Sequence, residues 1–168
     1  MKSVTIDQVI SWGPCATYGK TDKEIREKLE QLANGRESMT ALEILELDIP
    51  QRDIQWAILR EELIDAKNLH EFACWCAGQA LLGEREAGRE PHLNSWKAIE
   101  VKRRWIKGEA TDKELNAAWA AAGAAAWAAA GAAAGAAARD AAWAAAGAAA
   151  RAKQNNKLKE ILEGTKGE

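Results

Sequence analysis

Residues 117–152 read AAWAAAGAAAWAAAGAAAGAAARDAAWAAAGAAARA, an almost pure run of alanine that decides the fold class. Every fourth position from Trp119 to Arg151 is Trp, Gly or Arg. Alanine has the highest helix propensity, and a four-residue step advances about 400° around a helix, so these positions trace an inclined ridge. Such ridges interlock where helices cross, and Ala and Gly let two backbones approach closely. The repeat therefore predicts tightly packed α-helix.

The length of this repeat raises the question of how it is accommodated. One helix from Asp112 to Ala152 would be about 60 Å long, whereas a compact chain of this size has a radius of gyration near 15 Å. We expect either a long projecting helix or a helical hairpin. The best break is Arg139-Asp140, because a cation suits a helix end and an anion suits a helix start. The charge-free run 117–138 also permits a membrane span, but alanine is a weak membrane residue.

Capping-box sequences mark helix starts outside the repeat: TDKE at 21–24 and 111–114, and TALE at 40–43, which opens a helix ending near Leu47. Further helices are expected from Pro50, as first helical residue, to about Ile64, and over roughly 67–82 and 93–107, with a loop over 83–91. No run of alternating β-branched residues predicts a strand. The expected fold is an all-α helical bundle, one structural domain in which residues 1–110 form an N-terminal helical region and residues 111–168 form the tetrad-repeat region.

Charge and motif content narrow the function classes. Lys and Arg total 23 against 25 Asp and Glu, so no global positive field exists to hold long nucleic acid or an anionic membrane. Three cysteines without a disulfide framework, and no apolar leader, predict a soluble cytoplasmic protein. No Walker loop, nucleophile elbow, zinc-protease motif or dinucleotide fingerprint is present. We expect a non-enzymatic protein without cofactor or metal.

Three basic or titratable side chains fall on predicted apolar helix faces. Arg60 points inward and lies about 20° from Asp53 on the helical wheel, so it is either a buried ion-pair partner or an anion-binding residue. Lys102 lies within the apolar arc of its helix, so it needs a carboxylate, a bound anion or a route to the surface. His70 faces inward as a core histidine or as a ligand contact.

The remaining polar clusters favour structural interpretations. His70 and Cys74 have the spacing of a zinc half-site, but few further ligands remain in the chain. Cys74-Trp75-Cys76 lacks the two intervening residues of a redox motif, so its thiols are expected to be small core residues. The basic cluster Arg103, Arg104 and Lys107 is expected to be a solvated face.

The eight tryptophans are the last unusual feature. Amid alanine they can fill holes in a bundle, which we expect for Trp119, Trp127 and Trp143. Alternatively, planar rings stack on tryptophan while cations neutralise phosphates. The candidate ligand-binding residues are Arg60, His70, Lys102, Trp56, Trp96, Trp105, Trp119 and Arg139.

Several segments together resemble a family of bacterial and phage proteins known as immunity proteins, in which a shorter N-terminal region precedes a repetitive Ala/Trp-rich tail. The resemblance is carried by residues 41–50, 56–62, 69–77, 98–105 and 108–112, and continues into the repeat. It implies a role in conflict between bacteria and phages or rival bacteria, in the host cytoplasm.

Two mechanisms are compatible with that resemblance. In the first, the protein sequesters a small nucleotide-type immune signal, with Arg60, His70, Lys102 and nearby tryptophans forming the site. In the second, it binds and blocks a toxin or defence protein through an exposed surface. Because Ala ridges from two chains mesh as readily as two from one chain, a homo-oligomer is also expected.

Overall fold

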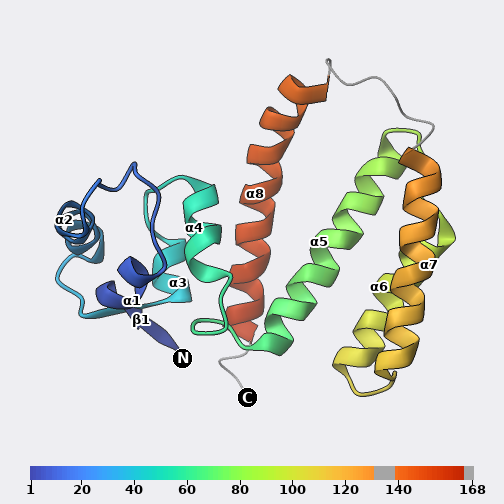
Figure 1. Cartoon of the computed structure of the whole chain (residues 1–168), viewed down its shortest axis with the longest axis horizontal. Coiled ribbons are helices and arrows are strands. Elements are labelled where there is room, and N and C mark those ends of the chain that lie inside the picture. The colour runs from blue at the N-terminus through green and yellow to red at the C-terminus, as the bar shows by residue number, and fades with distance from the viewer. Residues whose placement is uncertain (131–138, 165–168) are drawn as a thin grey trace. The chain divides into compact units, whose positions relative to one another are not determined.

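The structure is a computed structural model that describes residues 1–130 and 139–164, with side chains described outside 126–146 and 148. It is mostly α-helical, which confirms the expected fold class (Figure 1). The elements are β1 (Ser3–Thr5), α1 (Ile6–Ser11), α2 (Asp22–Ala33), β2 (Ser38–Thr40), α3 (Ala41–Leu45), α4 (Gln51–Ile58), α5 (Ala66–Glu86), α6 (Leu93–Ile106), α7 (Asp112–Ala130) and α8 (Arg139–Gly164).

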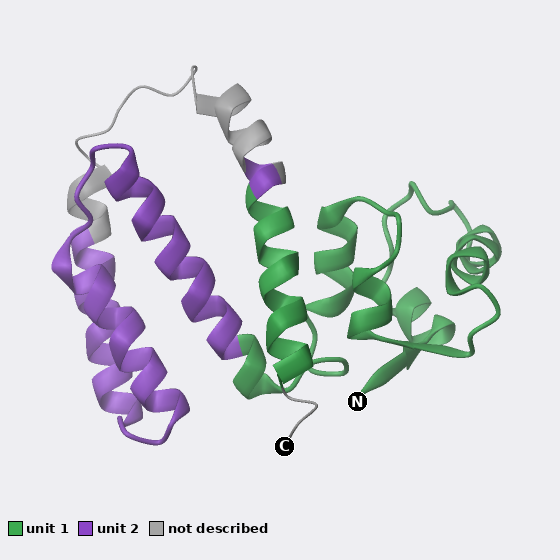
Figure 2. Cartoon of the chain, turned by 180° about the vertical axis from the view of Figure 1, so that it is seen from behind, with its two compact units in different colours: residues 1–69, 150–168 green, residues 70–149 purple. Residues whose placement is uncertain are grey.

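The chain forms two compact units (Figure 2). Unit 1 comprises residues 1–69 and 150–168, and unit 2 comprises residues 70–149. Both α5 and α8 therefore begin in one unit and end in the other. The division of the sequence at residue 110 stays a prediction.

The three predicted capping boxes are confirmed at the starts of α2, α3 and α7. At α7, the Glu114 carboxylate accepts from the Thr111 backbone N–H at 2.8 Å, and Glu114 N–H donates back to Thr111 Oγ1 at 3.2 Å. Thr5 and Gln8 form a fourth box at α1. Each box satisfies backbone donors that the first helical turn leaves without partners.

The expectation that no strand forms is wrong for two short segments. β1 and β2 pair antiparallel, with Val4 opposite Met39, and both of these side chains are buried. Three-residue strands are too short for alternation to show in the sequence. Their pairing depends on contacts between distant segments of unit 1.

The helix predicted from Pro50 to Ile64 ends early. α4 stops at Ile58 because Leu59 leaves helical geometry at ψ 60°, and Pro50 is its N-cap rather than its first helical residue. Arg60 N–H then donates a hydrogen bond to the Ile58 carbonyl at 2.8 Å, and Ile64 N–H donates one to the Arg60 carbonyl at 2.9 Å. Arg60 thus lies in a turn, outside the helical face used to predict its direction.

The loop predicted to begin at Gly83 begins later. α5 continues through Gly83 to Glu86, where a Cβ at Gly83 would meet no neighbouring atom, so this glycine is tolerated in the helix. Gly88, at φ 77°, then turns the chain in a left-handed conformation that favours glycine. Arg85 forms a bidentate pair with Glu90 across the connection.

The core of unit 1 is completed by the C-terminal portion of α8. Leu158 is fully buried, as are Ile54, Ile58 and Ile64. Three side-chain hydrogen bonds join this portion of α8 to the segment from α3 to α4, from Gln55 to Gln154, from Asn155 to Gln51 and from Lys159 to Glu46. The last helix of the chain is therefore an integral component of the N-terminal unit.

Unit 2 contains α6 and α7, which pack along each other. Ala98 and Val101 of α6 and Leu115 of α7 are buried between helices, and Phe72 and Cys74 are buried on α5. Cys74 is the small core residue that was expected, and burial raises the pKa of its thiol.

The predicted break lies at the edge of the described residues. The structure describes α7 as far as Ala130 and α8 from Arg139, and residues 131–138 lie outside the described residues. Arg139 and Asp140, where the break was predicted, are the first two residues of α8. Among the helices that are described, none is both long and apolar enough to cross a membrane.

Candidate ligand-binding sites

The structure distributes the predicted site residues between the two units. Arg60 and Trp56 belong to unit 1. Unit 2 holds His70, Lys102, Trp96, Trp105 and Trp119. The side chain of Arg139 lies outside the described residues.

Arg60 is enclosed by aromatic rings. Its guanidinium carbon lies 4.2 Å from the centroid of the Trp12 ring and 4.9 Å from that of Trp56. The proposed partner Asp53 instead accepts from Tyr18 Oη at 3.1 Å and pairs with Arg52. The guanidinium charge is therefore stabilised by the faces of tryptophans rather than by a carboxylate.

Lys102, His70 and Trp105 form one cluster in unit 2. Lys102 Nζ lies 3.7 Å from the Trp105 ring centroid, and the His70 ring meets the same indole edge to face at 5.4 Å. Trp105 Nε1 donates to Asp112 at 2.7 Å. The charge of Lys102 is thus stabilised by a cation–π contact, which is not among the alternatives that the sequence predicts. This cluster joins α5, α6 and α7 by direct contacts.

Two further predictions concern the tryptophans of the repeat and the possible zinc half-site. Trp119 is 58% exposed on α7, so it fills no hole in unit 2. The side chains of Trp127 and Trp143 lie outside the described residues. Within the described portion of the chain, no group of three or more His, Cys, Asp and Glu side chains is arranged to hold a metal ion.

A groove of about 460 Å³ in unit 2, here called the α5–α6 groove, has the size of a small-ligand site. One wall is a stripe of α5 with spacing i, i+3, i+4 and i+7, formed by Trp75, Gly78, Gln79 and Leu82. The other wall comes from α6 and its C-cap: Trp96, Ile99, Glu100, Arg103, Arg104 and Lys107. A Cβ at Gly78 would meet no atom within 4 Å, so the groove stays open above this residue.

Trp96, one of the residues that line the groove, carries a buried donor. Trp96 Nε1 is buried and has no hydrogen-bond partner in the part of the chain that the structure describes. The Arg85 guanidinium lies 5.1 Å from the Trp96 ring centroid, and Trp75 stacks nearly parallel to Phe72 at 6.3 Å. A buried polar group without a partner costs free energy, so an acceptor that reached this N–H after a shift of neighbouring side chains would relieve that cost.

The groove carries three cations and one carboxylate. Arg104 donates to the Glu109 carbonyl at 2.9 Å and lies 3.7 Å from Glu114. Among the described residues, neither Arg103 nor Lys107 forms an ion pair, and both are exposed. The groove thus presents, beside a tryptophan, two cations that no carboxylate of the described residues pairs with.

Trp96 is among the predicted ligand-binding residues, whereas the prediction for Arg103 and Lys107 is a solvated face. The signal was present, because Trp96, Arg103 and Lys107 fall within about 40° on a helical wheel. Trp75 was not predicted, because its position opposite Trp96 depends on how two helices meet.

Comparison of the chain with protein-family models, with curated proteins and with solved structures gave no match.

Proposed function

We propose that this chain is a non-enzymatic binding protein that sequesters a small nucleotide-type anion in the α5–α6 groove. The observation that carries the proposal is that Trp96 lines the same open groove as Arg103 and Lys107, two cations that form no ion pair among the described residues. These groups match the two halves of a nucleotide, a planar base with hydrogen-bond acceptors and a phosphate.

Each half of the ligand has a suitable counterpart in the groove. A nucleobase can stack on indole, an interaction worth about 1–3 kcal/mol per base. The guanidinium of Arg103 can bind two phosphate oxygens at once, and Lys107 adds a point charge. Glu100 supplies an acceptor for an exocyclic amine, which favours a base that carries one.

Sequestration is the role that such a site supports in the context of the family resemblance. A protein that removes a signalling nucleotide needs tight binding and no chemical step. The resemblance to immunity proteins supplies the biological setting, and the groove supplies the ligand chemistry. We propose that the protein acts in conflict between bacteria and phages by capturing a nucleotide signal of the bacterial defence.

Native mass spectrometry and calorimetry test the proposal with AMP, ATP and a cyclic dinucleotide as probes. The matched pair of variants is Arg103→Gln with Lys107→Gln in the groove, and Lys97→Gln with Lys113→Gln elsewhere in unit 2. Both double variants remove two positive charges. We expect the groove pair to weaken nucleotide binding by at least about ten-fold, since each lost charge-assisted hydrogen bond removes about 1.5–3 kcal/mol. The control pair should bind like the unmodified protein.

Trp96→Phe separates stacking from the indole hydrogen bond. It should keep some of the affinity while losing several-fold in binding. Equal losses in the groove pair and the control pair would show nonspecific charge attraction and overturn the site. Absence of any nucleotide adduct, with a protein retained from lysate of defence-activated cells, would replace this proposal with the inhibitor mechanism.

A further inference from the structure

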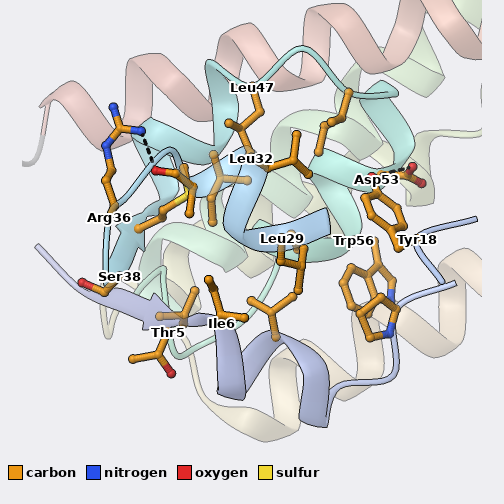
Figure 3. A pocket seen from close by; sticks show the side chains of 18 of the residues that line it. Thr5, Ile6, Tyr18, Leu29, Leu32, Arg36, Ser38, Leu47, Asp53 and Trp56 are labelled. Carbon is orange, nitrogen blue, oxygen red and sulfur yellow. Dashed lines mark hydrogen bonds between the residues drawn. The ribbon is translucent and has the colours of Figure 1, made fainter. Parts of the chain in front are cut away.

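Unit 1 contains a cavity of about 300 Å³ that the proposed function does not use. Side chains from β1, α1, α2, β2, α3 and α4 line it, together with the connecting loops. Its middle is aliphatic and includes Ile6, Leu29, Leu32 and Leu47 (Figure 3). Met39 and Ile44 also line the cavity. We refer to it as the unit 1 cavity.

Polar side chains occur at two opposite ends of the unit 1 cavity (Figure 3). Thr5, Arg36 and Ser38 lie at one end, and Tyr18 and Asp53 lie at the other. The exposed Glu37, which neighbours Arg36 in the chain, also lines the cavity. The arrangement suits an elongated molecule with an apolar body. A polar group of that molecule must therefore be placed at an end.

The two ends differ in what they offer to a ligand. Arg36 is already engaged, with Nη1 donating to the Ala33 carbonyl at 3.2 Å and Nε lying 3.4 Å from Glu43. Asp53, whose side chain is only 16% exposed, accepts from Tyr18 and from Arg52. A carboxylate has about four acceptor positions, so Asp53 retains capacity for further donors.

The Tyr18 phenol also favours a ligand group that donates a hydrogen bond at this end. Burial and the hydrogen bond to Asp53 raise the pKa of Tyr18 to about 12, so the phenol remains neutral and continues to donate to Asp53. Arg52 also lines the cavity, but its Nε is paired with Asp53 Oδ1 at 3.3 Å, so a ligand carboxylate at this end would meet a cation that is already engaged and would be repelled by Asp53. A hydroxyl or ammonium group would instead meet an acceptor.

We propose that the unit 1 cavity binds an aliphatic molecule of about ten heavy atoms whose head group donates a hydrogen bond to Asp53. The size follows from the cavity volume, taking about 30 Å³ for each water-sized group. The head group is an alcohol or a protonated amine. This site lies wholly in unit 1 and differs from the α5–α6 groove in position and ligand chemistry, so either proposal can fail alone.

The methionines provide a direct readout. The chain has two, and Met39 lines the unit 1 cavity whereas Met1 is 61% exposed and does not. In protein labelled with ¹³C at the methionine methyl groups, 1-octanol and octylammonium should shift the Met39 signal saturably and leave Met1 unchanged. Octanoate should bind at least about ten-fold more weakly. A Met39 signal that none of the three probes shifts would overturn the site.

Three variants locate the ligand and its head group. Leu29→Trp fills the cavity and should abolish the Met39 shift, whereas Leu59→Trp adds the same bulk at a residue that does not line it. If Leu29→Trp does not fold, Leu32→Phe makes the same test with a smaller increase. Asp53→Asn should remove the preference for octylammonium over octanoate. Unchanged binding in the filled variant, or octanoate binding as tightly as octylammonium in the unmodified protein, would contradict the proposal.

Discussion

Arg60 lies against Trp12, with its guanidinium carbon 4.2 Å from the ring centroid, although the two residues are far apart in the sequence. Trp12 also meets Trp56 edge to face, at 6.2 Å and 74°. The turn after α4 is thereby fixed to the residue that ends α1. Arg60, for which ligand binding stays a prediction, connects two segments of unit 1, and its Nε is buried with no hydrogen-bond partner among the described residues.

Replacing Arg60 should therefore reduce stability. Arg60→Ala removes cation–π contacts with two tryptophans, each worth about 0.5–2 kcal/mol, and we expect a loss of about 2 kcal/mol in the free energy of unfolding. The free energy of unfolding of Arg60→Lys should lie between those of the unmodified protein and Arg60→Ala, because lysine keeps the charge without the planar group. Urea unfolding followed by circular dichroism measures both variants. Loss of nucleotide binding at unchanged stability would support the ligand role predicted from the sequence.

Tyr18 can be titrated individually because it is the only tyrosine in the chain. Its pKa of about 12 is above the ordinary value of 10, so its contribution to stability is complete below pH 10 and disappears as the pH rises through 12. Asp53→Asn should lower the pKa of Tyr18 toward 10, since it removes the neighbouring negative charge. Tyrosinate absorbance measures this change, with circular dichroism at each pH confirming that the protein stays folded. Identical titration curves for both proteins would contradict the Tyr18–Asp53 hydrogen bond.

Leu158 tests whether the end of α8 belongs to unit 1. This side chain is fully buried, and truncating a buried leucine costs about 2–5 kcal/mol. We expect Leu158→Ala to destabilise the protein by that amount and to broaden the Met39 methyl signal of unit 1. Leu93→Ala, at a residue 74% exposed, should change stability by less than about 0.5 kcal/mol. Similar stability of the two variants would mean that residues 150–164 do not complete this core.

The sequence predicts a helix start correctly where residues within one helical turn determine it. The Thr21, Thr40 and Thr111 capping boxes depend on residues three positions apart, and each forms as predicted. The β1–β2 pairing depends on contacts between distant segments, and α4 ends where the backbone of Leu59 leaves helical geometry. Neither follows from periodicity.

The same distinction holds for the candidate sites: a contact within one helix can be predicted from the sequence, and a contact between distant segments cannot. Lys102 and Trp105 are three residues apart on one helix, and their contact was within reach of helical geometry. The Trp12 partner of Arg60 comes from another segment, so its aromatic surroundings could not be derived. The unit 1 cavity is assembled from six elements, and for that reason no single stretch of sequence indicates it.

The capping boxes also predict loss of stability in acid. Hydrogen bonds from the Thr111 backbone and side chain hold the pKa of Glu114 below its ordinary value, and Thr40 does the same for Glu43. A lowered pKa in the folded state means that the stabilisation is present above the ordinary pKa of glutamate and is lost as the pH falls through the lower, folded-state value. The effect reaches both units, because Glu43 lies in unit 1 and Glu114 in unit 2.

Glu114→Gln isolates the charge in this interaction, because glutamine can still accept the capping hydrogen bond. At pH 7 the variant should be less stable than the unmodified protein, since it loses the charge-assisted bond and the attraction to the nearby Arg104. The difference should shrink as the pH falls below the ordinary pKa of glutamate, because the unmodified carboxylate is then neutralised as well. Urea unfolding at a series of pH values measures it, with Glu62→Gln as an exposed control. A difference that stays constant in acid would assign the loss to altered geometry rather than to charge.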